Sequence, residues 1–283
     1  MNKKLLSLYG LKWNPFVPDV PVEALLCTPR IENFSRRLEN LAREGGFALV
    51  SGDPGMGKSV ALRIVVERLS ALRDVKVSLL ARPQARTADF YREIGDLFGV
   101  SLVPHNRWGG AKALREKWQS HIEAALFRPV LVIDEAQELL PTVLAELRLL
   151  ASSRLDSHTL LTTVFAGDTR LLNKLRTDDF APVDSRMRVR LILDRASPAE
   201  LEECLHHALE AAGAPRLMTP ELVTTLCEHA SGNFRTLMNM AGELLAAAAQ
   251  IEARQIDEKL FLEVFAVSAP ARPTKTSAGG RRR

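Results

Sequence analysis

The chain has 283 residues, of which 46% are hydrophobic and 25% charged; this is the balance of a folded globular protein and excludes an intrinsically disordered one. The net charge is +4, and residues 271–283 alone carry five basic side chains and no acid, so the basic character belongs to the tail. Three cysteines form no disulfide framework, and no run approaches the ~18 apolar residues of a membrane span, so we expect a cytoplasmic protein without membrane contact.

Residues 1–29 place aromatic side chains among prolines and predict an irregular arm packed on the body of the protein. Apolar residues at helical spacing predict helices over 29–43, 60–72, 87–99, 111–127 and 141–153. Short apolar or alternating runs predict strands over 47–52, 75–80, 129–136 and 159–168. Strands that alternate with helices indicate an α/β fold, a parallel sheet with helices on both faces.

The strand signals stop near residue 196, where we place a domain boundary. Four helical patterns follow, and the first opens with Ser197 and Glu200 at the spacing of a capping box. We therefore predict an α/β domain over 30–196 and a small helical domain over 197–268. Residues 269–283 predict a disordered basic tail, which either touches nucleic acid or only keeps the protein soluble.

The stretch GDPGMGKS fits the phosphate-loop pattern G-x-x-x-x-G-K-[ST] and stands between a predicted strand and a predicted helix. Glycines let backbone N–H groups point at phosphate oxygens, and the start of the helix adds its positive end. We expect Lys58 to reach the β- and γ-phosphates and the Ser59 hydroxyl to bind Mg²⁺. The residues expected to hold the nucleotide are Gly52, Asp53, Pro54, Gly55, Met56, Gly57, Lys58, Ser59 and Val60.

The run VLVIDEAQ ends a predicted strand in two acids, Asp134 and Glu135. A parallel strand delivers such residues to the same sheet edge as the phosphate loop. We expect Asp134 to join the Mg²⁺ ligands and Glu135 to activate the attacking water.

Hydrolysis also needs a group that senses the γ-phosphate and a cation beside it. The strand over 159–168 ends in Asp168, our first candidate for the sensing group, with Thr163 as the second. The cation candidates are Arg186, Arg188 and Arg190, any of which is either an ordinary surface arginine or a group that reaches the nucleotide of a neighbouring subunit. Arg235 begins a helix after a glycine and is placed to reach back across the domain cleft.

This order of motifs resembles that of the AAA+ ATPases. The stretches LYGLKWNPF, VLVIDEAQEL and SGNFRTLMN are most similar to the ExeA-like branch, which includes the TniB, TnsC and MuB type ATPases that accompany DDE transposases. The resemblance implies ATP and Mg²⁺ as ligands, a catalytic role for Lys58 and Glu135, Asp168 at the sensor-1 position, Arg186 as arginine finger and Arg235 as sensor 2. An acid at the sensor-1 position departs from the neutral polar residue usual in the family.

The resemblance further implies an ATP-dependent regulator of transposition that assembles as a ring or filament on double-stranded DNA, selects target DNA, and recruits or activates a transposase. The side chains expected to hold DNA phosphates, or else to form a solvated surface, are Arg82, Arg86, Arg107, Lys112 and Arg115. One alternative is an accessory ATPase of a secretion or envelope-assembly system that binds no DNA. Another is a nucleotide-dependent scaffold with negligible hydrolysis.

Overall fold

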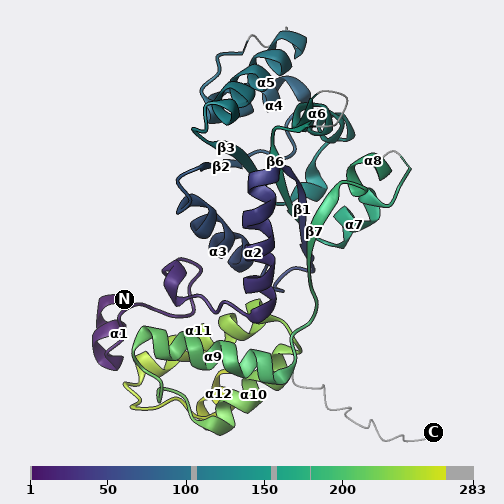
Figure 1. The fold of residues 1–283 in the computed structure, drawn as a ribbon. Helices are drawn as coiled ribbons and strands as arrows, with labels where there is room; N and C mark the ends of the chain where they lie inside the picture. The colour runs from purple at the N-terminus through teal and green to yellow at the C-terminus, as the bar shows by residue number, and fades with distance from the viewer. Residues whose placement is uncertain (1, 103–106, 154–157, 179, 266–283) are drawn as a thin grey trace, which may run out of the picture.

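A five-stranded parallel sheet organises the first domain of the computed structural model, which describes residues 2–102, 107–153, 158–178 and 180–265 (Figure 1). The strand order is β2-β3-β6-β1-β7, so β6 lies between β1 and β3. The carboxyl ends of β1, β3 and β6 therefore emerge side by side at one edge, with Ser51 beside Gly167 and Ile133 beside Phe165. The strands are β1 (Gly46–Gly52), β2 (Val75–Leu80), β3 (Arg128–Ile133), β6 (Thr162–Gly167) and β7 (Met187–Leu193).

Helices cover both faces of the sheet, as predicted. Alternate residues of β1 enter different cores: Phe47 and Leu49 face one, Ala48 and Val50 the other. Because both faces are buried, the strand is a continuous apolar run. The helices on the Ala48 face are α2 (Pro29–Glu44) and α3 (Lys58–Ser70). Those on the Phe47 face are α4 (Thr87–Phe98), α5 (Arg107–Glu123), α6 (Pro141–Ala151), α7 (Thr169–Leu175) and α8 (Ala181–Asp184).

The position of α5 corrects both predicted bounds of this helix, because it begins at Arg107 rather than at residue 111 and ends at Glu123 rather than at residue 127. Gly110 near its start lies beside α4: a Cβ built on this glycine would be in ordinary contact with the ring of Tyr91, at 3.6 Å. Further along, Trp118 packs edge-on against Phe98, with ring centroids 5.2 Å apart. These two contacts show that α4 and α5 run parallel, so they begin at the same end of the domain.

Four helices form the second domain, which lies below the sheet in Figure 1: α9 (Pro198–Ala212), α10 (Pro220–Ala230), α11 (Phe234–Gln250) and α12 (Glu258–Phe265). The predicted capping box is confirmed, since the Ser197 hydroxyl accepts from Glu200 N and the Glu200 carboxylate accepts from Ser197 N at 2.8 Å. The last strand of the sheet, β7, ends at Leu193, and the first of these helices, α9, begins at Pro198. The predicted tail over 269–283 lies outside the described residues.

The N-terminal arm is more regular than its composition predicts. Residues 2–9 form a helix, α1 (Asn2–Tyr9), and a 3-10 turn, η1 (Val22–Ala24), follows. Leu5 and Phe16 belong to the core of the helical domain, whereas Val22 and Leu25 pack against the core of the α/β domain. The arm thus contacts both domains.

Three short elements complete the described chain: η2 (Ala136–Glu138), β4 (Ser152–Ser153) and β5 (His158–Thr159). Within the described ranges, every helix is too short or too polar to cross a membrane.

The core between α4 and α5 provides a first prediction. Trp118 is fully buried, so Trp118→Ala should lower the free energy of unfolding by about 3–5 kcal/mol. Chemical denaturation measures this change. The matched control is Trp108→Ala on the same helix, where the side chain is 73% exposed and the change should stay within about 0.5 kcal/mol. Equal losses in the two variants would contradict the packing of α5 on α4.

Candidate nucleotide-binding site

The phosphate loop connects β1 to α3, and two of its glycines adopt a backbone conformation that other residues rarely take. Gly55 has φ 86° and Gly57 has φ 92°. A Cβ on Gly55 would collide with the side-chain amide of Asn233, which itself donates from Nδ2 to Pro54 O at 3.1 Å. The loop is therefore shaped by its glycines and is in direct contact with the helical domain.

Lys58 begins α3, and its buried side chain follows the loop. Its Nζ donates to Gly52 O at 2.7 Å and to Asp53 O at 3.2 Å. Ser59 is exposed in the first turn of the same helix. The structure thus brings the predicted lysine and hydroxyl together at the end of β1.

Asp134 and Glu135 follow β3 directly, at the sheet edge where the sequence places them. Glu135 N donates to Asp134 Oδ1 at 2.9 Å, and Glu135 has φ 51°, an uncommon value for a residue with a side chain. Burial raises the pKa of the half-buried Asp134 above its usual value, although the Glu135 N–H and the nearby Lys58 ammonium oppose the shift. Such an acid is costly to keep charged unless a cation joins it.

Gln137 links the two acidic strand ends, and the sequence reasoning missed it. Its Nε2 donates to the Glu135 carboxylate, and its Oε1 accepts from Asp168 N at 3.3 Å. A Cβ on Gly167 would lie 2.6 Å from that oxygen, so the glycine makes room for the amide. The sequence shows a polar residue two positions after Glu135, but the burial of its side chain is seen only in the structure.

Asp168 lies at the end of β6, as predicted, but its carboxylate is already engaged. It caps α7 by accepting from Arg170 N at 2.8 Å, and it accepts from Arg170 Nε at 2.9 Å. Thr163, the second candidate, was wrong: it is fully buried beside Phe47, towards the start of the strand and away from the phosphate loop.

Arg170 is a second residue that the sequence reasoning missed. Its guanidinium also pairs with Glu138, at 3.2 Å, and its side chain is 66% exposed. The preceding residue, Thr169, donates from its hydroxyl to Asp53 Oδ1 at 2.8 Å, which ties the start of α7 to the phosphate loop.

A cavity of about 510 Å³ lies where the arm, the phosphate loop and the helical domain meet. Lys58, Glu135 and Arg170 line it from the α/β domain, and Arg235 lines it from α11. The arm contributes an apolar wall of Phe16, Val17, Pro18, Leu25 and Leu26. A cavity with charged residues at one end and an apolar wall beside them suits a ligand that has both phosphate groups and a flat ring system.

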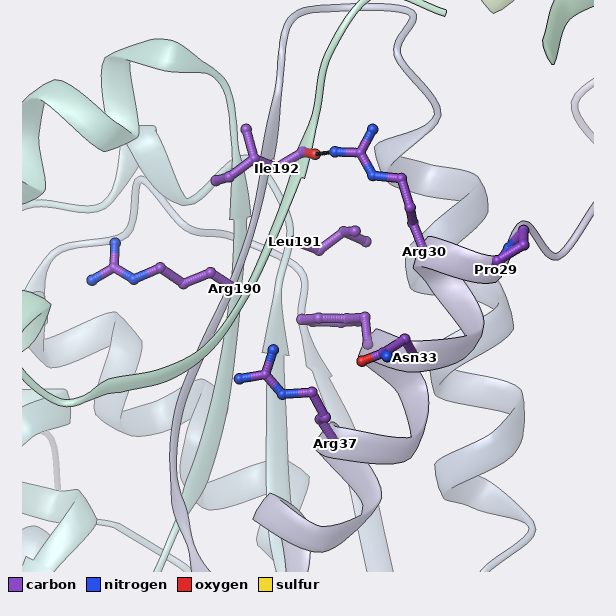
Figure 2. Close-up of a pocket in the computed structure, with 8 residues that line it drawn as sticks. Pro29, Arg30, Asn33, Arg37, Arg190, Leu191 and Ile192 are labelled. Carbon is purple, nitrogen blue, oxygen red and sulfur yellow. Dashed lines mark hydrogen bonds between the residues drawn. The ribbon is translucent and has the colours of Figure 1, made fainter. Parts of the chain in front are cut away.

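The three candidate arginine fingers lie along or just before β7. Arg188 pairs with Glu44 at 2.5 Å and Arg190 with Asp184 at 2.9 Å, so both have partners within the chain. Arg186 is half-buried in the turn before the strand. Figure 2 shows the hollow of about 350 Å³ between α2 and β7: Arg190 extends away from α2, whereas Arg30 points at the carbonyl of Ile192.

The candidate DNA-contacting residues gather around the beginnings of α4 and α5. Arg82 and Arg86 are exposed before α4; Lys112 is exposed on α5, where it pairs with Glu116 at 3.7 Å, and Arg115 is half-buried. The side chain of Arg107 lies outside the described residues. Trp108, which the sequence reasoning did not select, is 73% exposed, and Lys112 Nζ lies 5.7 Å from its ring centroid.

The strand order, the phosphate loop after β1 and the acidic pair after β3 together are those of the AAA+ P-loop fold. Residues 41–175 match the family model described as an AAA domain. The fold is similar to that of Cdc6p from Pyrobaculum aerophilum, with a TM-score of 0.69 and 18% identity over 88% of this chain and 70% of that one.

Two curated relatives are similar to this chain in sequence. General secretion pathway protein A of Aeromonas hydrophila is 29% identical over 230 residues, which are 79% of this chain and 41% of the relative. ATP-dependent target DNA activator B of Escherichia phage Mu is 25% identical over 223 residues, which are 77% of this chain and 65% of the relative. The chain spans less than two thirds of either relative. This chain is therefore similar to both proteins over most of its length.

The raised pKa of Asp134 leads to a stability prediction. Folding favours the neutral carboxyl of Asp134 more than the unfolded chain does, so the charged carboxylate lowers stability at neutral pH. This loss decreases as the pH falls through the raised pKa and is gone below the ordinary pKa of an aspartate. Asp134→Asn should therefore raise the Tm in the absence of Mg²⁺. A gain of about 1 kcal/mol in the free energy of unfolding would raise the Tm by ~2–4 °C. The difference from wild type should vanish in acid.

Thermal melts with EDTA between neutral pH and pH ~4 measure this effect. Asp19→Asn, at an exposed position of the arm, is the control and should leave the Tm unchanged at neutral pH. A lower Tm for Asp134→Asn than for wild type at neutral pH would contradict the prediction.

Proposed function

We propose that this chain is an ATP-dependent, DNA-binding regulator of transposition that assembles on double-stranded DNA in its ATP-bound form and recruits or activates a transposase. The observation that carries the proposal is the similarity to activator B, whose name states both ATP dependence and target DNA, along 77% of this chain. Hydrolysis of ATP would then release the assembly from DNA.

The residues around the phosphate loop suit ATP with Mg²⁺. Backbone N–H groups of the loop and Lys58 would hold the phosphates. The Ser59 hydroxyl and the Asp134 carboxylate are oxygen donors of the kind that Mg²⁺ prefers, and the bound ion would neutralise phosphate charge. The raised pKa of Asp134 fits a carboxylate that gains its partner with the ligand.

Glu135 is the candidate base for the attacking water, and the Gln137 amide holds its carboxylate in place. Arg235 would contact the phosphates from the helical domain. By resemblance, Arg186 would complete the site of a neighbouring subunit as arginine finger, which makes activity depend on a homo-oligomer.

DNA would lie against the surface formed by the starts of α4 and α5. Arg82, Arg86 and Lys112 offer exposed cations that hold phosphates without reading sequence. The exposed indole of Trp108 beside Lys112 adds a flat apolar group next to a charge, a combination typical of binding surfaces.

One experiment tests the proposal: ATPase rate with and without double-stranded DNA, together with retention of DNA in ATP, ADP or no nucleotide. We expect retention only with ATP and turnover that changes with DNA. Lys58→Ala should abolish ATP-dependent retention because it removes the phosphate contact. Glu135→Gln should bind ATP and trap the DNA-bound state, with turnover reduced about 10²-fold or more.

Full retention by Lys58→Ala would overturn the phosphate-loop assignment, and normal turnover by Glu135→Gln would move water activation to another group.

A second candidate function, an accessory ATPase of a secretion or envelope-assembly system without DNA binding, is favoured by the 29% identity to general secretion pathway protein A. Turnover that ignores DNA, with no retention in any nucleotide state, would put this candidate first.

The α5 surface gives a narrower prediction. Trp108→Ala should weaken DNA binding at least about fivefold, which corresponds to the ~1 kcal/mol typical of an exposed aromatic anchor. Fluorescence anisotropy of a labelled duplex with ATP measures the affinity. Leu262→Ala, at an exposed apolar position of α12, is the control and should bind DNA as wild type does. Unchanged affinity in Trp108→Ala would remove the indole from the DNA surface.

A further inference from the structure

We propose that Arg170 is the group that contacts the γ-phosphate at the end of β6, and that Asp168 is the positioning residue that holds it there. The assignment rests on the proposed binding of ATP. It answers a specific difficulty, because a carboxylate at this strand end would repel a phosphate. The guanidinium of Arg170 places N–H donors and a positive charge beside that carboxylate.

Two carboxylates from different elements fix the guanidinium. Asp168 Oδ2 accepts from Arg170 Nε at 2.9 Å, and Glu138, on the turn after β3, pairs with Arg170 Nη2 at 3.2 Å. The side chain of Asp168 is 15% exposed, whereas that of Arg170 is 66% exposed. A ligand that arrives from the cavity therefore meets the cation first.

The position of Arg170 relative to the phosphate loop is also fixed. Thr169, its neighbour in the chain, donates to Asp53 in the loop at 2.8 Å. Arg170 lines the same cavity as Lys58 and Glu135, the residues proposed to hold and attack the terminal phosphate. A guanidinium offers several N–H donors in one plane, a geometry that matches phosphate oxygens.

Acidic side chains gather at this end of the sheet: Asp53 in the phosphate loop, and Asp134, Glu135, Glu138 and Asp168. A third phosphate would add more negative charge at the same place. The α/β domain lines the cavity with the cations Lys58 and Arg170, and also with Arg30 and Arg63. The guanidinium groups of Arg30 and Arg63 bond backbone carbonyl groups of Ile192 and of Pro18 and Val20. We therefore expect Arg170 to contribute to the binding of ATP and not to the binding of ADP.

The test compares four variants by calorimetric affinity for ATP and for ADP, each with Mg²⁺, and by kcat. Arg170→Gln should weaken the affinity for ATP about tenfold or more and keep the affinity for ADP within about twofold of wild type. Its kcat should also be lower than that of wild type. Arg170→Lys should recover part of the ATP affinity, since it keeps the charge and loses the fork of donors. Asp168→Asn keeps a residue type that caps a helix well. It should shift the ratio of ATP affinity to ADP affinity in the same direction as Arg170→Gln does, but by a smaller factor.

Arg176→Gln is the matched control, because Arg176 is exposed at the other end of α7 and should change neither affinity nor kcat. An ATP-to-ADP affinity ratio within about twofold of wild type in Arg170→Gln would overturn the assignment and make the pair a solvated surface contact. Equal loss of both nucleotides would also overturn it, in favour of a role in folding. Wild-type protein that binds neither nucleotide would overturn the proposed function itself.

Discussion

The hydrogen bonds of the Gln137 amide join the ends of two strands, and the rest of the proposed site depends on them. One side of the amide holds the Glu135 carboxylate, and the other receives the backbone N–H of Asp168. This bridge is possible because β6 is the direct neighbour of β3 and because Gly167 leaves space for the amide. Strand order, a single glycine and one buried polar side chain therefore set the geometry of the acidic edge together.

The cavity is equally a product of both domains. Asn233 bonds the backbone of the phosphate loop, and the missing side chain of Gly55 lets it come that close. The arm adds its apolar wall while Leu5 and Phe16 anchor it in the helical core. A shift of the helical domain would thus move the loop, the wall and Arg235 at once, which offers a route by which ligand binding and domain position influence each other.

The sequence could predict features that short local patterns specify. The phosphate loop, the acids after β3, the alternation of strands with helices and the capping box at Ser197 all depend on residues close together in the chain. The sequence could not predict contacts between segments that are far apart in the chain. Gln137 and Arg170 acquire their roles from partners on other elements, and the helix at Arg107 forms where glycines usually interrupt one, because α4 supplies the packing. Exposure, which singles out Trp108, is likewise a property of the folded chain.

The edge strand β7 has a consequence for assembly. Open strand edges are templates on which another polypeptide can add, through backbone groups that lack a neighbour. Here guanidinium groups from α2 already occupy two carbonyl oxygens of β7. Arg30 bonds Ile192 O (Figure 2), and Arg37 bonds Arg188 O at 3.3 Å. Copies of this protein that meet along β7 would therefore associate through side chains, as separable units, and a sheet continuous from one subunit to the next is disfavoured. Such units can dissociate and exchange, whereas strands that join edge to edge tend towards fibres.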